Sequence, residues 1–169
     1  MKSKTHESKA HIRDRETLSL SGPDFLALLQ AVLKTGASLR FRAKGTSMSP
    51  LIKDGDIVTV AALREEQLSL GQVVAALHPE TSVLILHRIV RRKRNAYLLK
   101  GDNVSQADGQ VSRSGILGRV TAVERTKKRA FAGLGPERSI LALLSRGGFL
   151  AFFLAFARSL SGRTLKKVP

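Results

Sequence analysis

The feature that most constrains the fold is a series of short apolar segments separated by turn residues, between residues 39 and 123. Several segments are rich in β-branched side chains, as in Ile57, Val58, Thr59 and Val60. Short segments of this kind, bounded by Gly, Pro, Asn or Asp, are typical of antiparallel β-strands. The expected strands span residues 39–42, 56–60, 73–77, 83–90, 96–99 and 116–123. The sequence therefore predicts a mainly β fold, either a coiled antiparallel sheet or a partly open barrel.

An amphipathic helix is expected directly before these strands, over residues 21–36. Ser21 is a typical N-cap, Pro23 suits the first turn, and Gly36 is placed to end the helix. Apolar residues recur at helical spacing between these ends, at Phe25, Leu28, Leu29, Val32 and Leu33. The expected organisation is a flexible polar tail at 1–20, the helix at 21–36, a β domain at 37–127, and a basic, apolar, helical C-terminal segment at 128–169.

The charge balance is strongly basic, with a formal net charge of +16. Basic residues gather at 91–94, 125–129 and 163–167, and the first group is expected to form a hairpin loop over residues 91–95. Such a chain favours anionic partners, either lipid or nucleic acid. No motif of a nucleic-acid-binding fold accompanies the charge. An anionic membrane surface is therefore favoured over nucleic acid.

The C-terminal segment bears on the same choice of partner. Its apolar runs at 140–144 and 149–157 are separated by Arg146 and two glycines, and neither run reaches the roughly 20 residues that span a bilayer. An interfacial anchor and a helix packed on the domain fit this pattern equally well. We expect a membrane-associated protein, held peripherally or through this segment. The cytoplasmic face is favoured over export, because no apolar run follows the first basic residues.

The residues that could carry chemistry fall in three separate boxes. Residues 45–56 read Gly-Thr-Ser-Met-Ser-Pro-Leu-Ile-Lys-Asp-Gly-Asp, His87 ends an apolar stretch, and Lys-Gly-Asp-Asn at 100–103 precedes Asp108. A serine hydroxyl becomes a useful nucleophile when a histidine takes its proton and a carboxylate orients that histidine. Each box alone has an ordinary structural reading, as a polar turn or a core histidine. Cysteine, metal-ligand patterns and Gly-rich phosphate loops are absent, so we expect a reaction without metal or cofactor.

Together the boxes resemble the histidine-type branch of the signal peptidases, which includes the endoplasmic reticulum, archaeal and sporulation enzymes. This branch belongs to the S24/S26 serine peptidase superfamily, which also contains the self-cleaving SOS repressors. Bacterial signal peptidases and the repressors use a lysine base, whereas the equivalent position here is His87, 40 residues after Ser47. The resemblance covers about residues 40–123 and implies the coiled β-sheet of the signal peptidase catalytic core.

The resemblance implies a role for each residue of the boxes. Ser47 corresponds to the nucleophile, His87 to the general base, and Asp108 to the carboxylate that orients the histidine. Asp102 matches a second acidic residue, either a support for the site or an alternative to Asp108. The backbone amide of Ser47, with a neighbouring donor, is expected to hold the oxyanion.

The same box carries two apolar residues, Met48 and Pro50, that correspond to the substrate cleft. A core contact is an equally good reading of Met48. The expected function is a serine endopeptidase of signal-peptidase type that cleaves a precursor protein or peptide. A self-cleaving regulator related to the SOS repressors and a non-catalytic basic membrane-binding module are the alternatives. In one respect the chain departs from the family, because the helix before the serine box is too short to span a membrane.

Overall fold

The computed structural model describes residues 19–63, 68–125 and 128–129. The longer strands are β2 (Ile57–Ala62), β4 (Leu84–Arg92) and β7 (Ile116–Arg125). The shorter strands are β1 (Ser38–Arg42), β3 (Val73–Leu77), β5 (Ala96–Lys100), β6 (Gln110–Ser112) and β8 (Lys128–Arg129). A 3₁₀ turn, η1 (Arg113–Gly115), links β6 to β7. Of the expected polar tail at 1–20 and the expected helical C-terminal segment at 128–169, residues 1–18 and 130–169 lie outside the described residues. Residues 128–129 form β8 instead of starting a helical segment.

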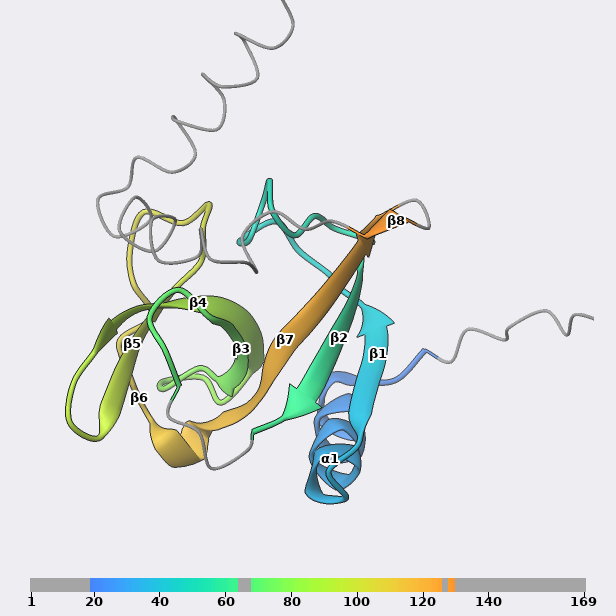
Figure 1. Ribbon diagram of the computed structural model, residues 1–169, viewed down its shortest axis with the longest axis horizontal. Helices are drawn as coiled ribbons and strands as arrows, with labels where there is room; N and C mark the ends of the chain where they lie inside the picture. Colours follow the sequence, from blue (N-terminus) through green and yellow to red (C-terminus); the bar gives the residue numbers. More distant parts are fainter. Residues whose placement is uncertain (1–18, 64–67, 126–127, 130–169) are drawn as a thin grey trace, which may run out of the picture.

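All strand pairs in the described residues are antiparallel, and the strands follow the order β1-β2-β7-β3-β4-β5-β6, with β8 pairing with β7. The sheet curls strongly through β3, β4 and β5 (Figure 1). Its end strands β1 and β6 are not paired with each other, so the described sheet is not closed into a barrel. The expectation of a coiled, mainly β fold is confirmed.

The six expected strands correspond to β1, β2, β3, β4, β5 and β7, with ends displaced by at most two residues. The predicted hairpin loop over 91–95 is narrower than expected, because β4 continues through Arg92. Strands β6 and β8 have three and two residues, which is too short to show an alternating pattern in a sequence.

The expected helix is present as α1 (Gly22–Lys34), with Ser21 as its N-cap and Pro23 in its first turn. Gly36 follows with a φ of +79°, which favours glycine at the end of a helix. Leu29 and Leu33 are buried, and the Phe25 ring meets the edge of Phe41 on β1 at a centroid distance of 4.8 Å. The helix is therefore packed against the sheet. No helix within the described ranges is long and apolar enough to cross a membrane.

Strand β7 joins the two halves of the core, because it pairs with β2 on one side and with β3 on the other. One apolar cluster combines α1, β1, β2 and the loop after β1 with residues of β3 and β7, and the other combines residues of β3, β4, β5, β6 and β7. Gly118 on β7 permits this close packing, since a Cβ there would lie 2.6 Å from Val60 Cγ1 and 2.8 Å from the Ala61 carbonyl oxygen.

Two loops meet at one end of this sheet (Figure 1). The β1–β2 loop carries the serine box, and the β5–β6 loop carries Asp102 and Asp108. The backbone N–H of Asn103 donates to the carbonyl oxygen of Ser47 at 2.7 Å. The fold therefore brings together boxes that lie more than 50 residues apart in the sequence.

Candidate active site

The β1–β2 loop holds Ser47 on a compact, anchored turn. Ser49 N–H donates to the Thr46 carbonyl, and Ile52 N–H to the Met48 carbonyl, both at 2.9 Å. Gly45 has a φ of +96°, a conformation that glycine adopts without steric cost, and its N–H donates to Asp54 Oδ1 at 2.8 Å. The apolar side chains of the loop are buried in the core, and Ser47 itself is half-buried. The serine hydroxyl thus lies on a loop with little freedom to move.

An ion pair supports the same loop from the end of β7. Arg125 Nε and Nη2 donate to the two carboxylate oxygens of Asp56 at 2.9 and 2.6 Å. The Arg125 Nη2 also lies 3.4 Å from the Pro50 carbonyl oxygen and 3.3 Å from that of Leu51. Burial by itself raises the pKa of Asp56, but hydrogen bonds from Arg125 and from the Lys53 N–H outweigh it and hold the pKa below its ordinary value. The pKa of Arg125 is raised by the hydrogen bond to Asp56.

His87 lies within β4 and pairs with Val74 of β3, so the sheet fixes the backbone that carries the imidazole. Its Nε2 is 2.9 Å from Ser47 Oγ, and its Nδ1 is hydrogen-bonded to Asp108 Oδ2. The side chains of His87 and Asp108 are 8% and 9% exposed. The serine, the histidine and the aspartate therefore form one continuous hydrogen-bonded chain, largely shielded from water.

Asp108 reaches the imidazole because its backbone is tied to the sheet. Its N–H donates to the Leu99 carbonyl oxygen of β5 at 2.9 Å. An ionised carboxylate can only accept hydrogen bonds, so contact with Asp108 favours the tautomer in which Nδ1 carries the proton. Nε2 is then left as an acceptor facing Ser47 Oγ, which is the arrangement that a general base requires.

The second acidic residue, Asp102, does not contact His87 but forms a buried ion pair with Arg88. Arg88 Nε and Nη2 donate to Asp102 Oδ1 and Oδ2 at 2.8 and 2.7 Å, and Arg88 Nη1 donates to the Gly71 carbonyl oxygen at 2.7 Å. The two side chains are 1% and 0% exposed. Asp102 is therefore paired with Arg88, and Asp108 is the carboxylate that contacts His87.

The pair fixes a backbone that touches both Ser47 and His87. A Cβ on Gly101 would lie 2.7 Å from the Ser47 carbonyl oxygen and 3.0 Å from His87 Nε2. Next along the loop, Asn103 Nδ2 donates to the Thr46 carbonyl oxygen at 3.3 Å, in addition to the backbone bond to Ser47. Sequence reasoning did not assign roles to Arg88, Gly101 or Asn103. Their position within or beside the boxes was the only signal available.

The two residues expected at a substrate cleft have different surroundings. Met48 is 4% exposed and belongs to the apolar core cluster, which matches the core-contact reading. Pro50 is half-buried, and its carbonyl oxygen receives the Arg125 contact described above. The backbone N–H of Ser47 donates to no acceptor within the described residues, so it is available to a ligand.

Other histidines do not join this group. His78 Nδ1 accepts from the N–H groups of Glu80 and Thr81, which places it in the β3–β4 turn. His6 and His11 lie outside the described residues. Within residues 19–63, 68–125 and 128–129, no group of three or more His, Asp or Glu side chains could hold a metal ion.

Comparison with known proteins agrees with this geometry at the level of the family. The profile described as Peptidase S24-like matches residues 10–121, about two thirds of the chain. No curated protein gives a significant match over the sequence. The matched region contains Ser47, His87 and Asp108, and the chain belongs to the S24-like family of peptidases.

Proposed function

We propose that this protein is a serine endopeptidase of the signal-peptidase type that cleaves a precursor protein or peptide. The observation that carries the proposal is the chain of contacts from Ser47 Oγ to His87 Nε2, at 2.9 Å, and from His87 Nδ1 to Asp108. This order of hydroxyl, imidazole and carboxylate supports acyl transfer by a serine. A histidine in place of lysine favours the histidine-type signal peptidases over the lysine-dependent branches.

The reaction follows from these positions. As Ser47 Oγ bonds to the substrate carbonyl carbon, His87 Nε2 takes the hydroxyl proton, and Asp108 stabilises the imidazolium that forms. The imidazolium then protonates the leaving amine, which breaks the peptide bond and leaves an ester on Ser47. Water attacks this ester while Nε2 takes its proton, and that proton returns to Ser47 Oγ when the acid product leaves.

The oxyanion of each tetrahedral intermediate needs a donor beside Ser47. The Ser47 N–H, which donates to no acceptor among the described residues, is the group we assign to it. Removing a donor of this kind costs about 10²–10³ in kcat in serine peptidases where it has been measured. The close support of the loop by Asn103 and Arg125 keeps this N–H fixed, which supports the assignment.

A self-cleaving regulator is the second candidate, because the family also contains the self-cleaving repressors. An Ala-Gly or similar cleavage site upstream of the serine box would support this candidate, and no Ala-Gly bond occurs in residues 1–46. Intact mass spectrometry of the purified chain tests this candidate. A loss of N-terminal residues that requires Ser47 would favour self-cleavage over cleavage of a separate substrate.

The test of the main proposal uses control substitutions of the same residue types, at Ser49 in the same loop as Ser47 and at His78 in the β3–β4 turn. Ser47→Ala and His87→Ala are compared with Ser49→Ala and His78→Ala on a precursor-peptide library supplied with anionic lipid vesicles. We expect the first two to reduce kcat by about 10⁴ or more and the controls to change it by less than about threefold. If the wild type does not cleave, or all four variants cleave equally, the proposal is wrong and a non-catalytic module becomes the better reading.

A further inference from the structure

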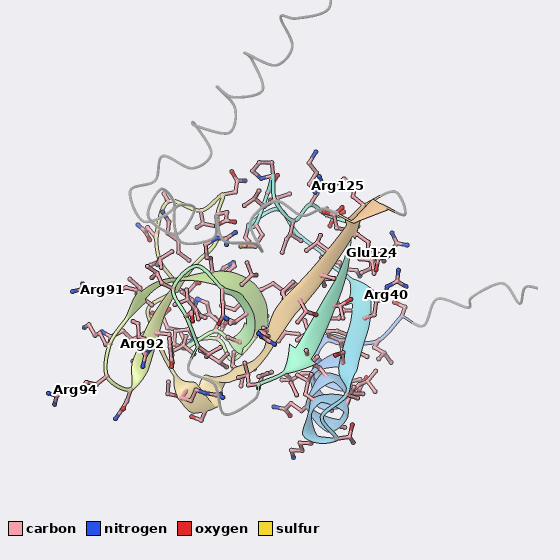
Figure 2. All side chains as sticks on the ribbon, viewed as in Figure 1. Arg40, Arg91, Arg92, Arg94, Glu124 and Arg125 are labelled. Atoms are coloured by element: carbon pink, nitrogen blue, oxygen red, sulfur yellow. The ribbon has the colours of Figure 1, made fainter. Side chains whose placement is uncertain are left out.

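The β4–β5 hairpin ends in four consecutive basic residues, Arg91 to Arg94, and all four are exposed. The turn is tight, with the Lys93 N–H donating to the Ala96 carbonyl oxygen at 2.8 Å. Arg91 and Arg94 point away from the sheet (Figure 2). Ala96, at the turn end of β5, pairs with Ser112, so the exposed Arg113 lies near the same turn. We call Arg91–Arg94 together with Arg113 the basic tip.

No carboxylate of the described residues lies in the strands that form this tip. The seven described acidic residues are Asp24, Asp54, Asp56, Glu80, Asp102, Asp108 and Glu124, and each belongs to α1, to β7 or to a loop at the other end of β4 and β5. Adjacent like charges repel each other, so a partner of opposite charge would stabilise the basic tip.

The basic tip and the serine box occupy opposite ends of the same hairpin. Arg88 pairs with Lys100 beside the site, whereas Arg92 pairs with Tyr97 near the turn. At about 3.3 Å per residue, His87 and Arg94 are on the order of 20 Å apart along β4. A surface bound at the tip would therefore leave Ser47 accessible to a peptide.

The shape and composition of the tip favour a lipid surface over a nucleic acid. Single-stranded nucleic acids are bound in basic grooves with aromatic side chains for stacking, whereas the tip is a convex turn without an aromatic residue. Tyr97, the aromatic residue next to it in β5, is 7% exposed and buried in the core. A few arginines on a protruding turn suit the phosphate and carboxylate groups of a flat anionic leaflet.

We propose that the basic tip is a docking site for anionic phospholipid headgroups, which holds the protein on a membrane with the serine box facing away from the surface. This inference does not depend on catalysis, because it is carried by the charge and position of the tip alone. The basic, apolar sequence at 140–167 is consistent with the same partner.

The experiment measures binding of the full chain to vesicles of phosphatidylcholine alone and with 30 mol% phosphatidylserine. Lys93→Gln/Arg94→Gln is compared with Lys34→Gln/Lys44→Gln, which removes the same charge from exposed positions elsewhere. Each cation near an anionic leaflet contributes roughly fivefold in affinity. We expect the tip variant to bind anionic vesicles about 25-fold more weakly and the control within about threefold of the wild type. Binding should also weaken in 0.5 M salt.

Two further measurements keep the outcome decisive. Thermal unfolding should be the same for both double variants, because all four positions are exposed, and Lys93→Arg should bind vesicles as the wild type does. Equal losses for the tip and control variants would overturn the proposal, as would a wild type that binds both kinds of vesicle alike. A tip variant that loses affinity for a 20-base-pair DNA duplex, but not for anionic vesicles, would assign the tip to nucleic acid instead.

Discussion

The buried pair of Arg88 and Asp102 yields the sharpest test of how the site is supported. In Arg88→Met, Asp102 loses two hydrogen bonds of 2.8 and 2.7 Å, and the Gly71 carbonyl oxygen loses one of 2.7 Å. With 0% exposure, the Asp102 carboxylate cannot turn to water without a change of structure. Removing one partner of a buried pair costs about 3–5 kcal/mol, which is a large part of the roughly 5–15 kcal/mol that stabilises a domain.

The assay is urea unfolding at pH 7, with the exposed pair of Arg40 and Glu124 as the control. That pair has the same two-pronged geometry, at 3.1 and 2.6 Å, but its side chains are 46% and 27% exposed. Arg40→Met should therefore cost much less stability than Arg88→Met, because water screens an exposed pair. Replacing both buried partners, in Arg88→Met/Asp102→Leu, should recover most of the loss, because no charge is left buried without a partner.

The pair also positions the backbone beside Ser47, which adds a readout in the folded variant. Asp102 lies between Gly101, which closely approaches the serine and the histidine, and Asn103, which bonds to Ser47. At low urea, where Arg88→Met is still folded, kcat should fall more than tenfold while KM changes less. A cost as small as that of Arg40→Met would refute the reasoning.

Three further expectations concern the loop contacts. Gly101→Ala should reduce kcat by at least about 100-fold, since its Cβ would lie 2.7 Å from the Ser47 carbonyl oxygen. Gly22→Ala, with open space around it, should leave activity unchanged. Equal activities of the two variants would contradict the close approach of Gly101 to Ser47. Arg125→Met should lower kcat and increase hydrogen exchange in a peptide covering residues 46–54, and Arg40→Met should do neither, because only Arg125 contacts the Pro50 and Leu51 carbonyls. The pKa of Asp56 is lowered by folding, so its stabilisation is complete above the ordinary carboxyl pKa of about 3.9 and is lost as the pH falls below it. The urea midpoint should therefore fall less steeply between pH 5 and 3 in Asp56→Asn, and an identical slope would show that Asp56 does not titrate in this range.

Much of the fold could be predicted from local sequence because its signals are local. The N-cap at Ser21, the proline at position 23 and the glycine at 36 define α1 by backbone chemistry alone. The longer strands have enough residues to show an apolar pattern, and all six expected strands begin within one residue of the observed start. A strand of two or three residues has no such pattern, and β6 and β8 exist because a neighbouring strand offers hydrogen bonds.

The site was predictable only in part, for a different reason. Resemblance could align Asp102 and Asp108 with acidic positions, but spacing cannot say which carboxylate turns toward the imidazole. That depends on Arg88, whose guanidinium takes up Asp102 in the interior, and on the Leu99 carbonyl, which holds the Asp108 backbone. Arg125 contacts Leu51 and Pro50 of the serine loop, which lie 74 and 75 positions before it in the sequence. Such contacts appear only when the sheet is formed.

These supports explain how a small antiparallel sheet can hold Ser47 on a loop beside His87. The loop is attached to the ends of three strands that differ in sequence position: β1 leads into it, β7 reaches it through Arg125, and β5 leads to Asn103. His87 comes from β4, the direct neighbour of β5. Because each strand is registered against the next, displacing one support shifts Ser47 relative to His87, and the 2.9 Å contact is sensitive to such a shift. Catalytic loss from a support variant should therefore track the distance between these two atoms more closely than it tracks global stability.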